Sequence, residues 1–377
     1  RDAQESRGLG DVYKRQLLDT IACLFEGREE LFKGLHIDNQ WDWQKTNPVI
    51  RLSFGSGVLQ NREALDTRIR YQLQENRERL GLPSAPASDI PGEFTDLITD
   101  AHQHHGQPAV VLIDEYDKPI LDNLREADRA RELREGLKNL YSVLKDADPH
   151  LRFVMLTGVS KFSKVSLFSG LNNLNDITLD APLAAVCGYT DNDIDSVFEP
   201  ELAGLDRERI KSWYNGYRWG AETVTSVYNP FDVLLLFQKR EFGPYWFESA
   251  TPTFLIDILS ERGVYTPTLD QWETEYELLS QFDVEQISTE ALLFQSGYLT
   301  IQSVREPMVG YRQYTLGFPN REVETSLNHA LLPSLGVKDG PSQRRTLFSC
   351  LKNHDLAALE AHLKALYAGL PHDWYRN

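Results

Sequence analysis

Long apolar runs and cysteines are both scarce in this sequence. No apolar run among its 377 residues approaches the roughly 18–20 residues of a membrane-spanning helix. The three cysteines, Cys23, Cys187 and Cys350, lie far apart and form no C-x-x-C pair. These absences exclude a transmembrane helix, a disulfide framework and a cysteine zinc site. They predict a reduced, cytoplasmic protein that does not enter a membrane.

Positive charge is also in short supply. Lysine and arginine total 39 against 56 aspartates and glutamates, which gives a formal net charge of −17. Such a surface repels phosphate backbones, so a nucleic-acid partner would need a local basic patch. The candidates for that patch are scattered among acidic residues, where a solvated surface is the more common interpretation: Lys161, Lys164, Arg207, Arg209, Lys211 and Arg218.

Two catalytic motifs are missing as well. No G-x-S-x-G occurs, which argues against a serine hydrolase. No G-x-x-x-x-G-K-[ST] occurs either, so no phosphate-binding loop is visible. Gly8, Gly10 and Lys14 do not replace it, because no strand precedes them. A histidine cluster at 102–105 lacks an identifiable fourth ligand for zinc.

Both ends of the sequence are unusual. Residues 1–16 (RDAQESRGLGDVYKRQ) resemble a translated sequencing adapter, whereas a helical apolar pattern starts abruptly at Leu17. We therefore expect residues 1–16 to be non-native and leave them out of the fold prediction. The sequence stops at His372–Asn377, directly after a helical segment, so we expect a fragment of a longer protein.

The first half alternates between strand and helix patterns. Short apolar runs predict strands, and Ala109–Ile113 and Leu151–Thr157 are typical of strands buried on both faces. This alternation predicts a parallel α/β sheet. The other expected strands are Pro48–Phe54 and, more weakly, Ile177–Leu179, and the expected helices are Leu17–Phe25, Asn61–Leu80, Phe94–His105 and Ala127–Leu144.

After Cys187 helices dominate. Thr190 has the position and the following acidic residues of a helix N-cap. Two strands, Tyr298–Val304 and Gln313–Leu316, are expected to form a hairpin beside helices, as in a winged-helix-like domain. The expected helices are Asp206–Trp213, Phe231–Phe237, Thr253–Ser260 and Thr289–Gln295, with a closing pair at Ser342–Leu351 and Leu356–Tyr367.

The segment Val110–Asp117 (VVLIDEYD) carries the strongest chemical signal. A buried strand followed by Asp-Glu is the Walker B pattern of P-loop ATPases. The strand would deliver Asp114 to the edge of the sheet, where a carboxylate can hold Mg²⁺. Glu115 would then lie beside the γ-phosphate and could act on the attacking water. The alternative is an ordinary buried strand whose terminal residues, with Asp117 and Pro119, start a helix.

Two further segments contain candidate nucleotide-binding residues. The next strand ends in a hydroxyl-rich turn, where Thr157 and Ser160 could sense phosphate and Lys161 could bind it. Arg218 lies in the segment Trp213–Trp219, where it could reach the γ-phosphate. The alternatives are a glycine turn with a solvated lysine and an aromatic-lined structural turn.

Longer segments resemble the bacterial AAA-ATPase-like family over essentially Leu17–Asn377. They are LLDTIACLFEGREELFKGL, VVLIDEYDKPILD, LYSVLKDADPHLRFVMLTGVSKFSKVSLFSGLNNLNDITLD, IKSWYNGYRW and YWFESATPTFLI. The resemblance implies a P-loop ATPase followed by a PD-(D/E)XK nuclease-like domain. It assigns Mg²⁺ to Asp114, the catalytic base to Glu115 and phosphate sensing to Thr157 and Ser160. This sequence departs from the family because it lacks the phosphate loop and the nuclease-like domain.

We therefore expect an α/β fold: a P-loop NTPase-like parallel sheet, incomplete at its N-terminus, followed by a mainly helical, winged-helix-like domain. The expected divisions are a non-native segment at 1–16, an ATPase core at 17–187, a lid domain at 188–340 and a helical linker at 341–377.

The expected function is Mg²⁺-dependent ATP hydrolysis by the intact parent protein, with this fragment inactive without the phosphate loop. The alternative is a nucleotide-regulated or nucleotide-free interaction module, a scaffold that acts through protein or nucleic-acid partners. An arginine supplied by a neighbouring copy would require a homo-oligomer, and the sequence leaves that open.

Overall fold

The computed structural model describes residues 11–84, 88–159, 167–168, 171, 173–221, 224–250, 253–264, 266–275, 288–331 and 340–368. The chain divides into two units. The first comprises Arg1–Thr251 and Tyr265–Glu324, and the second comprises Pro252–Val264 and Thr325–Asn377. Within the described ranges, no helix is long and apolar enough to cross a membrane.

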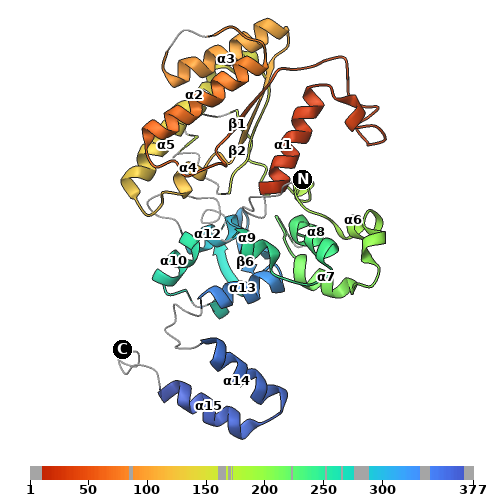
Figure 1. Cartoon of the computed structure of the whole chain (residues 1–377), viewed down its shortest axis with the longest axis vertical. Helices are drawn as coiled ribbons and strands as arrows, with labels where there is room; N and C mark the ends of the chain where they lie inside the picture. The colour runs from red at the N-terminus through yellow and green to blue at the C-terminus, as the bar shows by residue number, and fades with distance from the viewer. Residues whose placement is uncertain are drawn as a thin grey trace. The chain divides into compact units, whose positions relative to one another are not determined.

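A three-stranded parallel sheet organises the N-terminal part of the first unit (Figure 1). Its order is β1 (Val49–Ser53), β2 (Ala109–Asp114) and β3 (Leu151–Leu156). Every residue of the central strand β2 is buried, and its partners run in parallel register from Val49 opposite Val110 to Ser53 opposite Asp114. The structure thus confirms an α/β fold with a parallel sheet.

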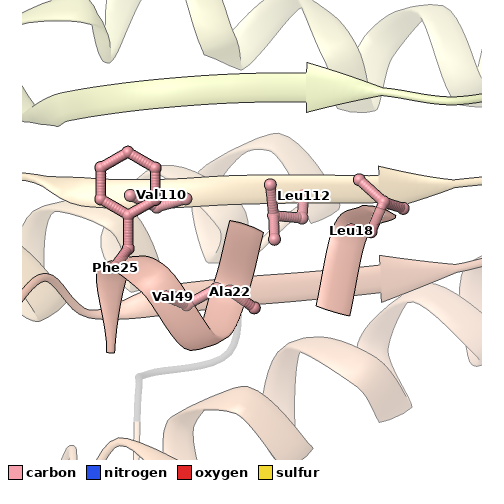
Figure 2. Close-up of a cluster of buried hydrophobic side chains, with 6 residues drawn as sticks. All are labelled: Leu18, Ala22, Phe25, Val49, Val110 and Leu112. Carbon is pink, nitrogen blue, oxygen red and sulfur yellow. The ribbon is translucent and has the colours of Figure 1, made fainter. Parts of the chain in front are cut away.

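Helices cover both faces of this sheet. Helix α1 (Asp11–Phe25) contacts β2 on one face, whereas α2 (Arg62–Arg79), α3 (Ile90–His105) and α5 (Ala127–Asp146) pack against one another on the other side (Figure 1). Side chains alternate along a strand, so Val110 and Leu112 face α1 while their neighbours face the opposite helices. Figure 2 shows this α1 face, which is built from Leu18, Ala22, Phe25, Val49, Val110 and Leu112.

The outer edge of β1 is closed by side chains of α2. Asn76 accepts a hydrogen bond from Arg51 N at 2.9 Å and donates one to Arg51 O at 2.8 Å. Gln72 accepts from Ser53 N, and Arg79 donates to Val49 O. An unpaired strand edge would otherwise leave these backbone groups without partners, so α2 completes the sheet on this side.

The strand β3 differs from its prediction as a strand buried on both faces. Its residues are mostly half-buried, and Arg152 and Phe153 are exposed. The physical reason is position, because β3 pairs only with β2 among the described strands and so lies at the edge of the sheet. Phe153 stacks on Phe25 with ring centroids 5.6 Å apart, which shields part of its ring.

Two other expectations about this region are wrong. Ile177–Leu179 forms no strand, although its β-branched and apolar residues suggested one. Helix α1 begins at Asp11, six residues before the expected start at Leu17, so part of the segment that we set aside is helical. Short 3₁₀ turns connect several elements: η1 (Glu29–Leu31), η2 (Asp148–His150), η3 (Ala181–Leu183), η4 (Glu199–Leu202) and η5 (Thr266–Thr268).

The rest of the first unit is mainly helical, as predicted. Thr190 caps α6 (Asp191–Ser196) through a reciprocal capping box with Asp193. The core beside it contains Ile194, Ile210, Tyr214, Tyr228, Val233 and Leu236. The other helices are α7 (Arg207–Tyr214), α8 (Pro230–Lys239), α9 (Tyr245–Ala250), α12 (Thr289–Gln295) and α13 (Arg321–Leu331), whose end belongs to the second unit.

A second sheet of three antiparallel strands accompanies these helices. Its order is β4 (Trp272–Glu275), β6 (Tyr311–Gly317) and β5 (Thr300–Met308). The β5–β6 hairpin confirms the predicted pair, whereas β4 was not predicted. Gly216 touches the segment that follows β6: its φ is +103°, and a Cβ there would lie 1.8 Å from Pro319 O. Only glycine fits this position.

The second unit contains α10 (Thr253–Glu261) and the helix pair α14 (Gly340–Lys352) and α15 (Leu356–Ala368). The pair confirms the two closing helices expected from the sequence. Phe348, Leu351 and Leu356 are exposed on it.

Candidate active site

Three strand ends meet at the carboxyl edge of the parallel sheet. β1 ends beside Gly55, β2 ends at Asp114, and β3 ends beside Thr157. Backbone hydrogen bonds continue beyond the strands, from Phe54 N to Asp114 O at 3.1 Å and from Thr157 N to Ile113 O at 2.8 Å. Open α/β sheets bind their ligands at this edge, so a functional site of this sheet is expected here.

Asp114 is buried, and its two carboxylate oxygens have different surroundings. It is 5% exposed, and its Oδ1 accepts a hydrogen bond from the Thr157 hydroxyl at 2.8 Å. Its Oδ2 is buried and accepts no hydrogen bond within the described residues. A buried carboxylate oxygen in that state is costly without a cation nearby.

Glu115 follows in an unusual backbone conformation. Its φ is +51°, in the left-handed region that a non-glycine residue enters at a cost of about 1–2 kcal/mol. The side chain is only 3% exposed and lies against Gly55, where a Cβ would come 3.1 Å from Glu115 Oε1. The absence of a side chain at Gly55 therefore leaves room for this carboxylate. Strained residues of this kind concentrate at functional sites.

The acidic pair attracts a guanidinium. Arg15 Nε lies 3.3 Å from Asp114 Oδ2, and Arg15 Nη2 lies 3.1 Å from Glu115 Oε1. The neighbouring Lys14 donates to Gly158 O at 2.6 Å. The two carboxylates therefore attract positive charge to this edge of the sheet.

Asp117 has a different role from the one we expected. It occupies the N-cap position of α4 (Lys118–Leu121), but its side chain forms no capping hydrogen bond. Instead, Asp117 Oδ1 accepts from Val159 N at 3.2 Å, which ties the β2 turn to the loop after β3. Gly158 permits this approach, since a Cβ there would lie 2.6 Å from Asp117 Oδ1 and from the Tyr116 ring.

Tyr141 supports the same turn from α5. It is fully buried, and its hydroxyl donates to Tyr116 O at 2.9 Å. Burial, followed by the charge of Asp117, raises the pKa of Tyr141 well above its ordinary value, so the hydroxyl remains a neutral donor. Sequence reasoning missed Gly55, Gly158 and Tyr141. A glycine just after each outer strand was the available signal for the first two.

The remaining predicted site residues are placed as follows. Thr157 is brought to Asp114. Ser160 and Lys161 lie outside the described residues. Arg218 lies by the antiparallel sheet, where its guanidinium donates to Gln302 O at 3.1 Å and its backbone N donates to Thr300 Oγ1 at 2.7 Å. Within the described residues, no contact joins Arg218 to the acidic pair.

Two of the basic residues proposed for nucleic acid, Arg207 and Lys211, are engaged with acidic ones. Arg207 pairs with Asp191 at 2.7 Å and with Asp195 at 2.6 Å, and Lys211 pairs with Asp191 at 2.8 Å. Burial opposes ionisation of Asp191, but hydrogen bonds from Lys211, Tyr228 and Arg207 outweigh it and lower its pKa to about 2. These ion pairs reduce the positive charge that a phosphate backbone would meet.

The donor set at the sheet edge fits Mg²⁺ in one specific way. Across the described ranges, no group of three or more His, Cys, Asp or Glu side chains could hold a metal ion. Mg²⁺ commonly binds through one or two carboxylates, with phosphates and waters completing the shell. Asp114 Oδ2, which faces the guanidinium of Arg15 and accepts no hydrogen bond within the described residues, suits that arrangement. The histidines at 102–105 do not gather a zinc site: His102 pairs with His150, and His105 lies 3.2 Å from Leu80 O.

Comparisons with known proteins identify the family of this chain. A family model described as "Predicted AAA-ATPase" matches residues 14–168, which include all three strands of the parallel sheet. A curated relative from Azotobacter chroococcum mcd 1, described as an uncharacterized protein in the vnfD 5′ region, is 53% identical over 367 residues. The alignment covers 97% of this chain and 70% of that protein. No solved structure matches. The chain therefore belongs to the AAA-ATPase-like family.

Proposed function

We propose that this chain contains the core of a P-loop ATPase, in which the carboxyl edge of the parallel sheet serves ATP and Mg²⁺. The observation that carries the proposal is the buried pair Asp114–Glu115, in which Asp114 Oδ1 accepts from the Thr157 hydroxyl and Asp114 Oδ2 faces positive charge, the guanidinium of Arg15. The β5–β6 hairpin and the surrounding helices form the winged-helix-like lid in this proposal. The divisions at 17–187, 188–340 and 341–377 belong to it as well.

Each residue has a distinct role in the proposed reaction. Asp114 holds Mg²⁺ through Oδ2, either directly or through water, while Thr157 fixes its other oxygen. Bound Mg²⁺ supplies positive charge that neutralises the phosphate oxygens. Glu115 orients the attacking water for in-line displacement at the γ-phosphate and accepts its proton.

The second group of residues binds phosphate in this proposal. Ser160 and Lys161 follow β3 and offer a hydroxyl and an ammonium to the γ-phosphate. Arg218 would have to exchange its hydrogen bond to Gln302 O for a phosphate oxygen. The nucleic-acid partner and the homo-oligomer remain proposals without a contact that supports them.

A test of the metal role compares Asp114→Asn with Asp128→Asn in the product of the complete reading frame. Asp128 is fully exposed on α5 and provides a matched loss of one carboxylate. ATP affinity would be measured with Mg²⁺ and with EDTA. We expect Asp114→Asn to abolish the Mg²⁺ enhancement of ATP binding and Asp128→Asn to retain it. Full enhancement in Asp114→Asn would refute the metal role.

The alternative is a nucleotide-free interaction module. It is favoured by the ion pairs of Arg15, which compensate both carboxylates within the chain, and by the lack of a G-x-x-x-x-G-K-[ST] motif in the sequence. Absence of ATP binding by both the unaltered protein and Asp114→Asn, with or without Mg²⁺, would favour this alternative.

A further inference from the structure

A cavity of about 460 Å³ lies at the opposite end of the parallel sheet from the acidic pair. It opens where β1 begins and where α1, α2 and α3 end, and nothing in the proposed ATPase reaction uses it. Its charged and titratable lining residues are Glu26, Arg28, Arg51, Arg79 and His105. The volume lies within the range of small-ligand sites.

Three arginines in this cavity share one carboxylate. Arg28 Nη2 lies 3.1 Å from Glu26 Oε2, Arg51 Nη2 lies 3.1 Å from Glu26 Oε1, and Arg79 Nη1 lies 3.7 Å from Glu26 Oε1. Arg51 also pairs with Asp19 at 2.9 Å. The formal charge of the lining is therefore positive, with three guanidiniums against Glu26.

Two further features distinguish these arginines. Burial, and after it the charge of Arg51, lowers the pKa of Arg79 from its ordinary value. Arg51 Nε is buried and donates no hydrogen bond within the described residues. An anion in the cavity would counter the lowered pKa of Arg79 and would offer a hydrogen-bond acceptor to Arg51 Nε.

The lining also restricts the kind of ligand. The rest of it is Thr46–Val49 and Leu80, and the lining contains no Phe, Tyr or Trp ring, so that the imidazole of His105 is the ring on which a base could stack. Guanidinium forks match the oxygens of phosphate groups. The C-termini of α1, α2 and α3 each carry a partial negative charge, of about half an elementary charge in an ideal helix, which opposes weakly charged anions. A ligand with several anionic oxygens offsets that opposition, because it can bind more than one of the three guanidinium groups at once.

We propose that this cavity binds a diphosphate group through Arg28, Arg51 and Arg79, with Glu26 as a competing internal anion. The site lies away from Asp114 and requires no metal. Diphosphate binding in this cavity does not depend on whether the sheet edge hydrolyses ATP.

In the test, isothermal titration calorimetry measures the affinity of the whole chain for inorganic pyrophosphate, without Mg²⁺ and at low ionic strength. Arg28 is the best variant, because its side chain is 54% exposed and Glu26 is its ion-pair partner. We expect Arg28→Gln to weaken pyrophosphate binding about tenfold. Glu26→Gln is expected to strengthen binding, because it removes the competing carboxylate. Arg131→Gln, on the surface of α5 beside Asp128, serves as the matched control.

The direction of the Glu26→Gln effect separates binding from a merely structural role. Loss of fold would weaken binding in both variants, so thermal unfolding is measured alongside. The proposal would be overturned if pyrophosphate showed no saturable binding, or if Arg28→Gln and Arg131→Gln bound it with equal affinity. Weaker binding by a folded Glu26→Gln variant would also overturn it. ADP without Mg²⁺ identifies the source of the diphosphate. If ADP binds more tightly than pyrophosphate and this binding depends on Arg28, the natural ligand is a nucleotide. If ADP binds equally tightly or more weakly, the natural ligand is the free diphosphate ion.

Discussion

Thr157 links the ends of two strands through a single hydroxyl. Its Oγ1 donates to Asp114 Oδ1 at 2.8 Å, and the residue is only 8% exposed. This contact fixes Asp114 Oδ1 and leaves Asp114 Oδ2 to a cation, which in the structure is the guanidinium of Arg15 and in the proposed metal role is Mg²⁺. At this scale, the site depends on side chains supplied by neighbouring strands.

Replacing this hydroxyl should weaken the site without removing a charge. We expect Thr157→Val to lower ATP turnover about tenfold and to raise the Mg²⁺ concentration needed for half-maximal activity, because Asp114 loses its fixed orientation. Thr95→Val is the matched control, since its hydroxyl donates only to Pro91 O within α3. Equal activities in the two variants would contradict the role of Thr157.

Gly158 provides a second test at this scale. We expect Gly158→Ala to lower the free energy of unfolding by about 1–3 kcal/mol, because the new Cβ would lie 2.6 Å from both Asp117 Oδ1 and the Tyr116 ring. Chemical denaturation measures the change. A variant as stable as the unaltered chain would show that the turn after β2 can move away from this loop.

At the scale of elements, the two edges of the parallel sheet differ. Side chains of α2 satisfy the backbone of β1, with Asn76 binding both polar groups of Arg51. No comparable cover over β3 occurs in the described part of the chain. The apolar run of β3 predicted the strand correctly, but it could not predict that Phe153 would be partly exposed, since exposure depends on which strands lie beside it.

The cover of β1 can be tested directly. We expect Asn76→Leu to destabilise the chain by about 2–3 kcal/mol, because the N–H and C=O of Arg51 would be left without partners in a buried setting. Gln74→Leu, on the exposed side of α2, is the control and should change stability by less than about 0.5 kcal/mol. Urea unfolding of both variants measures the difference. Equal stabilities would mean that water replaces Asn76.

The helical part contains a buried pair of carboxyl groups. Asp232 and Glu322 are both fully buried, and each carboxyl group is close enough to shift the pKa of the other. Asp232 Oδ1 accepts from Trp246 N at 2.8 Å, and Glu322 Oε1 accepts from Phe247 N at 3.1 Å, so both hold the first turn of α9. Burial is the main cause that raises the pKa of each carboxyl, and for Asp232 the charge of Glu322 comes next.

This pair predicts a pH dependence of stability. A carboxyl whose pKa is raised by folding binds its proton more tightly in the folded state. Its contribution to stability is therefore complete below the unfolded pKa and is lost as the pH rises. We expect the melting temperature to fall above the ordinary glutamate pKa of 4.5 and through neutral pH. Glu322→Gln should reduce this slope, whereas the exposed Glu324→Gln should not. Identical slopes in the two variants would contradict the assignment.

For the whole molecule, the sequence predicted local structure better than long-range contacts. Apolar runs and helical spacing identified the parallel sheet, the β5–β6 hairpin and the closing helices. The contacts of Asp117 with Val159, and of Asp232 with Glu322, join residues 42 and 90 positions apart, and no local pattern encodes such pairs. The proximity of Asp114 and Thr157 could be predicted because parallel strands place successive C-terminal residues at one edge, whereas their proposed roles remain predictions. The proposed domain divisions remain predictions.

The measurement that tests the central claim most directly is phosphate release by the product of the complete reading frame, with Glu115→Gln beside Glu132→Gln. Glu132 is exposed on α5 and provides a matched substitution. If Glu115 acts on the attacking water, Glu115→Gln should retain ATP while turnover falls at least a hundredfold. Glu132→Gln should behave as the unaltered protein. Unchanged turnover in Glu115→Gln would contradict the assignment of the sheet edge as an ATPase site.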